Sequence, residues 1–116
     1  MAQRIDEVPK GTLDLMVLKA LAAGRTHGYG LSRWIRATTD GALDIDDGAL
    51  YPALHRLESR RLIRAEWGVS ENNRKARYYQ LTADGRRHLA HEVTAWSRFA
   101  EAMWKIVNAR PVEGSA

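Results

Sequence analysis

Seven basic side chains gather in the middle of the chain, between positions 56 and 77. They are Arg56, Arg60, Arg61, Arg64, Arg74, Lys75 and Arg77. The same interval holds three acidic residues, so its surplus equals the formal net charge of +4 of the whole 116-residue chain. A local excess of Lys and Arg is typical of a surface that binds phosphate groups. A solvated charged face is the commoner alternative.

Residues 46–63 predict the element that would carry this chemistry, a short amphipathic helix. Leu50, Leu54 and Leu57 recur at helical spacing and must face a core. The opposite side carries small, flat or hydrogen-bonding residues: Gly48, Ala49, Tyr51, Pro52, His55, Arg56 and Ser59. Such a face suits a helix in a DNA major groove, with an ordinary surface helix as the alternative.

Details of this helix can also be predicted. Asp46 or Asp47 is expected to cap its N-terminus. Pro52 would delete a backbone hydrogen bond, so the helix is expected to start late or to be loosely wound at first. The hydroxyl of Tyr51 could reach a phosphate, or the ring could pack on a neighbouring helix with a solvated hydroxyl.

The sequence contains little that would support an enzymatic or a metal-binding function. The chain has no cysteine, and its four histidines, His27, His55, His88 and His91, lack ligand spacing with carboxylates. No nucleophile motif is present. Residues 27–30 (His-Gly-Tyr-Gly) lack the pattern of a phosphate loop, and residues 44–48 are out of register for a calcium loop. We therefore expect no enzyme, no metal and no cofactor.

Two helices should precede the groove helix. Thr12 is expected to cap the first, whose apolar residues run to Leu21, and Gly24 should end it in a left-handed conformation. Residues 27–30 form a turn into a second helix that ends near residues 39–41. This order is that of a helix-turn-helix unit. A brief extended piece is expected at Leu43 and Ile45.

A β-hairpin follows the helical unit. Residues 62–67 alternate as a strand, residues 69–73 form a polar turn, and residues 74–81 form the return strand. A hairpin in this position is a wing. Its tip and rising edge carry Arg74, Lys75 and Arg77, which are free to lie over a phosphate strand or a minor groove.

Thr82 is expected to cap a long last helix with an apolar seam. The seam consists of Leu89, Val93, Trp96, Phe99, Ala100, Met103, Ile106 and Val107. Steps of three and four residues resemble a coiled-coil seam, and such a helix would expose a large apolar area if it stood alone in water. Pairing with a second copy is therefore expected, with folding back onto the first helix as the alternative.

Four motifs in this order resemble the PadR family of bacterial transcriptional regulators. They are residues 11–14 (Gly-Thr-Leu-Asp), residues 27–30, residues 48–58 (Gly-Ala-Leu-Tyr-Pro-Ala-Leu-His-Arg-Leu-Glu) and residues 73–82, over a span of about 11–107. The resemblance implies a mainly α fold with a two-stranded wing: a winged helix-turn-helix domain followed by a C-terminal dimerisation helix. It also implies a homodimer that binds a palindromic double-stranded DNA operator, usually as a repressor.

Carried onto this chain, the resemblance places two groups of residues at DNA. They are Gly48, Ala49, Tyr51, Pro52 and His55 on the third helix, and Arg74, Lys75 and Arg77 on the wing. The family often has Thr or Ser at the position of Ala49, so one hydroxyl contact is missing here. The acidic pair before the helix, Asp46 and Asp47, would repel phosphate. Some short family members bind planar aromatic compounds through a tryptophan; Trp96, then Trp104, would be the equivalent, with simple packing as the alternative.

The expected organisation has four parts: an N-terminal arm (1–10), a DNA-binding domain (11–82), a dimerisation helix (83–109) and a tail (110–116). No segment has the length and apolarity of a membrane span, and no secretory signal is evident, so the cytoplasm is the expected location. The competing function is a winged-helix module that binds protein instead of DNA.

Overall fold

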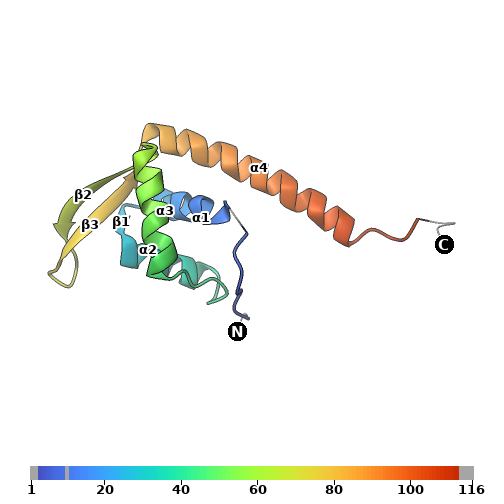
Figure 1. The fold of residues 1–116 in the computed structure, drawn as a ribbon, viewed down its shortest axis with the longest axis horizontal. Helices are drawn as coiled ribbons and strands as arrows, with labels where there is room; N and C mark the ends of the chain where they lie inside the picture. The colour runs from blue at the N-terminus through green and yellow to red at the C-terminus, as the bar shows by residue number, and fades with distance from the viewer. Residues whose placement is uncertain (1–2, 10, 113–116) are drawn as a thin grey trace.

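The computed structural model describes residues 3–9 and 11–112. Its elements are α1 (Thr12–Ala23), β1 (Thr26–His27), α2 (Gly28–Thr38), α3 (Asp47–Ser59), β2 (Ile63–Val69), β3 (Lys75–Leu81) and α4 (Ala83–Val107). Helices α1 to α3 pack together beside a small sheet, and α4 runs away from them as a long arm (Figure 1). Within the described residues, no helix is both long and apolar enough to cross a bilayer.

The sheet has three strands, in the order β1-β3-β2, so a short strand that was not predicted joins the two strands of the wing. The extra strand β1 pairs antiparallel with β3, with Thr26 opposite Tyr79 and His27 opposite Tyr78. Two residues are too few to show the alternation that identifies a strand in a sequence. β2 and β3 form the predicted hairpin, which with its turn we call the wing (63–81).

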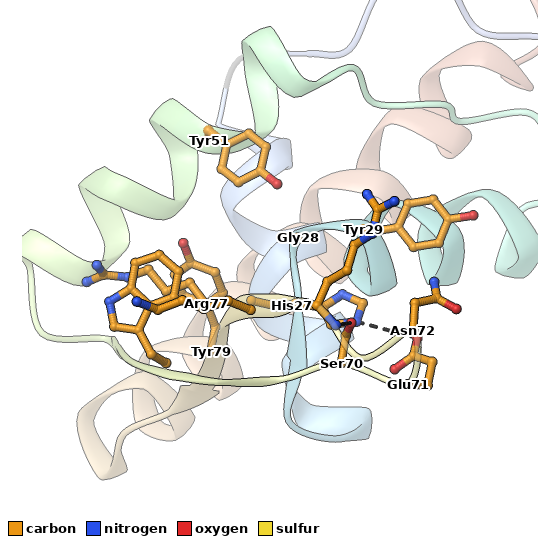
Figure 2. Close-up of a pocket in the computed structure, with 13 residues that line it drawn as sticks. His27, Gly28, Tyr29, Tyr51, Ser70, Glu71, Asn72, Arg77 and Tyr79 are labelled. Carbon is orange, nitrogen blue, oxygen red and sulfur yellow. Dashed lines mark hydrogen bonds and ion pairs between the residues drawn. The ribbon is translucent and has the colours of Figure 1, made fainter.

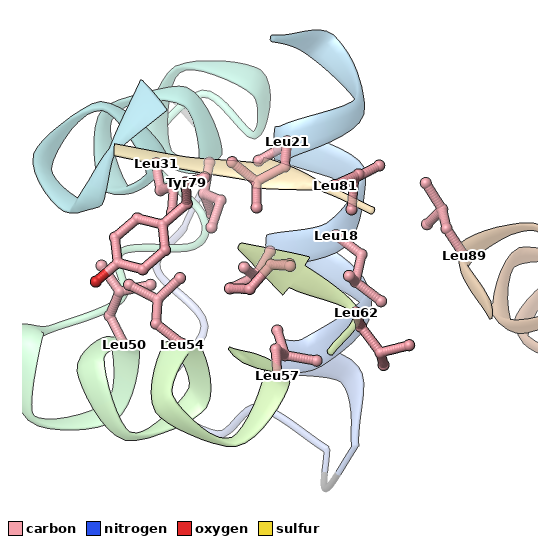
Figure 3. Packing of buried hydrophobic residues seen from close by; sticks show 14 of the residues in the cluster. Leu18, Leu21, Leu31, Leu50, Leu54, Leu57, Leu62, Tyr79, Leu81 and Leu89 are labelled. Carbon is pink, nitrogen blue, oxygen red and sulfur yellow. The ribbon is translucent and has the colours of Figure 1, made fainter. Parts of the chain in front are cut away.

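The core lies where the three helices meet the sheet. Leu50, Leu54 and Leu57 are at most 1% exposed, which confirms the predicted apolar stripe of α3. They pack in one cluster with residues of α1, α2, β3 and α4, including Leu18, Leu31, Tyr79, Leu81 and Leu89 (Figure 3). Because this cluster holds one side of α3, the opposite side of the helix is left for solvent or a partner.

The start of α3 differs from expectation. Asp46 caps it as predicted, with Oδ1 accepting a hydrogen bond from the backbone N–H of Ala49 at 2.9 Å. The expected late or loosely wound start is wrong, because the helix begins at Asp47 and continues through Pro52. Proline cannot donate to the carbonyl of Gly48. Gly48 is exposed, so water can satisfy that carbonyl.

The caps of α1 also differ from expectation, although the helix ends at Gly24 as predicted. Gly11, in a left-handed conformation (φ 89°), is the N-cap residue, and the hydroxyl of Thr12 donates to the carbonyl of Pro9 at 2.6 Å. Gly24 ends the helix, but its φ of 160° is extended and not left-handed. Glycine adopts either conformation without a steric penalty, so the residue type alone does not decide between them.

The expected extended piece at Leu43 and Ile45 is not a strand. This connection runs beside the described part of the N-terminal arm, where the N–H of Ile5 donates to the carbonyl of Ala42 at 2.8 Å. The arm over residues 3–9 has no helix or strand. Residues 1, 2 and 10 of the predicted arm lie outside the described residues.

α4 is anchored at its beginning and exposed over the rest of its length. Thr82 caps it as predicted, accepting from the N–H of Gly85 at 3.0 Å. Gly85 lies so close to the residue that precedes β2 that a Cβ there would collide with the carbonyl oxygen of Leu62. Leu89 is buried and the first part of α4 packs against α1, whereas the helix from Val93 onward is largely exposed. Of the predicted tail, residues 110–112 are not helical and residues 113–116 lie outside the described part.

Candidate nucleic-acid interface

The outer face of α3 carries the five residues assigned to DNA on that helix. Gly48, Ala49, Tyr51, Pro52 and His55 are all exposed. They alternate at helical spacing with the buried leucines, so the same periodicity that anchors the helix presents this face. The face is rich in small side chains, which permits close approach to a polar surface.

A cleft lies between this face, the start of α2 and the wing. Its volume is about 780 Å³, and a second hollow of about 550 Å³ adjoins it. The two share Tyr51, Arg77 and Tyr79, so we treat them as one cleft. Figure 2 shows Tyr51 entering from α3 and Arg77 from the wing, with His27 and Tyr29 at the start of α2. Arg74 and Lys75 also line the cleft.

Tyr51 is positioned by a glycine. A Cβ on Gly28 would lie 2.6 Å from the Tyr51 hydroxyl oxygen, so the ring occupies space that any other residue at position 28 would fill. The side chain is nevertheless 47% exposed and lines the cleft. The hydroxyl end of Tyr51 thus packs against α2 while the side chain as a whole remains accessible from the cleft, so both interpretations offered for Tyr51 stay open.

The three cationic side chains assigned on the wing have different surroundings. Arg77 forms an ion pair with Glu58 of α3, at 2.7 Å between Nη2 and Oε2. The Nζ atom of Lys75 lies 4.9 Å from the centre of the Trp67 ring. Among the described residues, the side chain of Arg74 has no ion pair within 4.0 Å. Arg74 and Lys75 are thus free to meet phosphate, whereas Arg77 already has a partner.

Glu58 and Trp67 were not assigned to the site from the sequence. Strand alternation puts Trp67 on the same face as Ile63, and in the observed register it lies opposite Arg77. Predicting this contact required the register of the hairpin. No local signal pairs Glu58 with Arg77, because 19 residues separate them.

The turn of the wing is fastened to the start of α2. His27 is the N-cap residue of α2, with Nδ1 accepting from the N–H of Gly30 at 3.0 Å, and its Nε2 lies 3.5 Å from a carboxylate oxygen of Glu71. A backbone hydrogen bond of Glu71, and then the nearby His27, lower the pKa of the Glu71 carboxyl. Glu71 therefore stays ionised to a lower pH than a free glutamate. This contact links the turn of the wing to the start of α2.

Not every basic residue of the central segment faces the cleft. Arg56 pairs with Asp14 of α1 at 3.0 Å, and so joins two helices. Arg64 lies on the opposite face of the hairpin from Ile63, because side chains alternate along a strand. Burial raises the pKa of the Tyr79 phenol, which also lines the cleft. Within the described residues no group of three His, Asp or Glu side chains could hold a metal ion.

The two tryptophans considered for an effector are separated by the structure. Trp96 lines an apolar hollow of about 260 Å³ together with Leu15, Met16 and Trp34, between α1, α2 and α4. Trp104 does not line this hollow and is 69% exposed. Trp34 of α2, which was not assigned to this site from the sequence, lines the same hollow as Trp96.

Three packed helices, of which the third has an exposed outer face, and a hairpin beside that third helix define a winged helix-turn-helix protein. The family model for the PadR-like transcriptional regulators matches residues 17–91, so the chain belongs to that family. It is a DNA-binding transcriptional regulator, and the family's members are not enzymes.

Solved structures support this assignment. A transcriptional regulator from Clostridium thermocellum is 29% identical, with a TM-score of 0.78 over 85% of this chain and 96% of the other. A PadR family regulator from Eggerthella lenta is also 29% identical, with a TM-score of 0.71 over 87% and 86% of the two chains. By sequence, an uncharacterised protein of Lysinibacillus sphaericus is 28% identical over 95 residues, which are 82% of this chain and 87% of that protein.

Proposed function

We propose that the protein is a repressor that binds a palindromic operator as a homodimer. The observation that carries the proposal is the exposed apolar seam of α4. Phe99 is 58% exposed, Ile106 70% and Val107 67%. Met103, Trp96 and Val93 extend the same side of the helix and are each about 40% exposed. Contiguous apolar area of this kind is rare on a monomer and marks an interaction surface.

A second copy of the chain is the occupant that fits this seam best. The apolar positions repeat in steps of three and four from Leu89 to Val107, which is the spacing by which two helices interlock. Leu89 is already buried in the core, so the remaining positions, including Ala100, would form the dimer interface. The anchored start of α4 would then hold the two DNA-binding domains at a set distance.

In the proposed complex, α3 enters the major groove. Gly48, Ala49, Tyr51, Pro52 and His55 would meet base edges and the nearest phosphates, and Arg74, Lys75 and Arg77 would meet the flanking backbone or minor groove. Twofold symmetry would place the two α3 helices about one turn of DNA apart, ~34 Å, and so select a palindrome. Occupation of an operator by such a dimer would block transcription.

A small aromatic effector would bind at Trp96. The support for this is the apolar hollow beside Trp96 and Trp34, which a planar ring could enter. Trp104 would take part only if the partner subunit brought it close. Quenching of tryptophan emission by planar aromatic compounds, lost in Trp96→Leu, would support this site; unchanged emission across a broad set would leave Trp96 with a packing role.

Sedimentation combined with a gel-shift assay tests the proposal. The expected results are a dimer in solution and a shifted band with duplex from the region upstream of its own gene. Scrambled duplex of the same length should compete weakly, and affinity should fall steeply between 50 and 200 mM salt. A monomer, or a dimer that shifts no duplex at 50 mM salt, would contradict the proposal and favour a module that binds protein.

A further inference from the structure

One large side chain in the cleft is not among the residues assigned to DNA in the proposed complex. Trp67 on β2 lines the cleft, and its side chain is 60% exposed, although tryptophans are on average highly buried. It lies opposite Arg77 in the hairpin, on the strand face that begins with the buried Ile63. The ring therefore stands on the side of the wing that faces α3.

The surroundings of Trp67 are cationic. The Nζ atom of Lys75 is 4.9 Å and the Cζ atom of Arg77 5.9 Å from the ring centre, both within the range of cation–π attraction. Arg74 lines the same cleft. Among the described residues, the indole N–H of Trp67 has no hydrogen-bond acceptor from another side chain. The ring thus offers apolar area and a free donor within a group of positive charges.

We propose that Trp67 is a direct contact of the wing to the sugar–phosphate backbone of double-stranded DNA. Its ring packs against a deoxyribose, and its indole N–H donates to a phosphate oxygen. A polyanion fits this site better than an apolar protein segment, because two cations lie within 6 Å of the ring centre. The inference rests on the proposed function and adds a non-ionic contact to the ionic ones of the wing.

The test compares full-length Trp67→Ala, Trp67→Phe and Val69→Ala with the wild type in gel-shift titrations at several salt concentrations. Val69 is the matched control, because it is an exposed apolar residue two positions along the same strand and does not line the cleft. Trp67→Ala should weaken binding about tenfold at every salt concentration, as the loss of one anchoring aromatic does. Trp67→Phe, which keeps a ring but lacks the donor, should weaken it about threefold. Val69→Ala should bind as the wild type does.

The salt dependence separates a direct contact from an indirect one. A contact without charge releases no counterions, so Trp67→Ala should keep the wild-type slope of log affinity against log salt. A slope lower by about one would mean that the ring acts only by ordering Lys75, and would overturn the inference. Wild-type affinity in Trp67→Ala would overturn it as well and leave the proposed function intact. Absence of any DNA binding by the wild type would instead mark the failure of the proposed function.

Discussion

The cleft beside the wing and the outer part of α4 are both uncovered in the single chain, but they are built from opposite kinds of side chain. The cleft is lined by Tyr51, Trp67 and cationic side chains, of which Arg77 has an ion-pair partner and Lys75 a cation–π partner. The exposed side of α4 carries Phe99, Met103 and Ile106, which lack polar groups. A surface of the first kind can remain in water until a polyanion arrives, whereas one of the second kind is stable only when covered.

This difference indicates which of the two surfaces, the cleft or the exposed side of α4, must be covered first. Apolar area gains roughly 25 cal/mol per Å² when it leaves water, at any salt concentration. Phosphate contacts depend on released counterions and weaken as salt rises. We therefore expect association through α4 to be permanent and binding in the cleft to be reversible. The predictions below test each side of this comparison.

The largest effect is expected from a charge on the α4 seam. Met103→Asp should convert the dimer into a monomer, because a buried unpaired carboxylate is strongly unfavourable. Loss of the second DNA-binding domain should then lower operator affinity by at least about a hundredfold. Sedimentation and gel shift measure the two effects. Thr94→Asp places the same charge on the opposite side of α4 and should stay dimeric; equal behaviour of the two variants would contradict the assigned interface.

Removal of the free cations of the wing should have the next largest effect. Arg74→Ala with Lys75→Ala should weaken binding to all duplexes about tenfold or more at 0.15 M salt and reduce the salt slope by about two. Arg64→Ala removes a cation from the other face of the hairpin, so its slope should stay close to the wild-type value. If the double variant kept both affinity and slope, the wing would not contact phosphate.

Glu58→Gln is expected to have a smaller effect, of opposite sign. The substitution removes the carboxylate that holds Arg77 and adds one positive charge to the cleft. Affinity for any duplex should rise about threefold at low salt, with a steeper salt slope. Glu66→Gln is the control, because Glu66 pairs with Arg25 instead of with a cation of the cleft. Weaker binding by Glu58→Gln would show that the carboxylate is needed to orient Arg77.

The smallest effect is expected from the Tyr51 hydroxyl. Tyr51→Phe keeps the ring that packs against Gly28 and removes a group without an intramolecular hydrogen bond to another described side chain. Operator affinity should fall about twofold, and thermal stability should not change. Tyr78→Phe, which removes a hydroxyl bonded to the Val69 carbonyl, should leave affinity unchanged. Equal affinities of Tyr51→Phe and the wild type would limit Tyr51 to packing.

Local patterns in the sequence were enough to predict most of the helices, the hairpin and the outer face of α3. The spacing of Leu50, Leu54 and Leu57 depends on the pitch of one helix, and the caps at Asp46 and Thr82 depend on residues three positions apart. The assignment of individual residues to DNA, effector and dimer contacts stays a prediction, because the structure holds a single chain without partners.

Contacts between distant segments were decided by the tertiary structure alone. Four features each join elements that are separate in the sequence: the pairing of Arg77 with Glu58, the packing of Tyr51 on Gly28, the pairing of β1 with β3, and the hollow that Trp34 and Trp96 both line. The spacing of the residues in these contacts does not identify their partners, because helix and strand periodicity indicates only which face of its own element a side chain occupies. Which residue meets that face depends on how the elements pack. For this reason the sequence alone could identify the cations of the wing but could not show that Arg77 is paired and that Arg74 and Lys75 are free to meet phosphate.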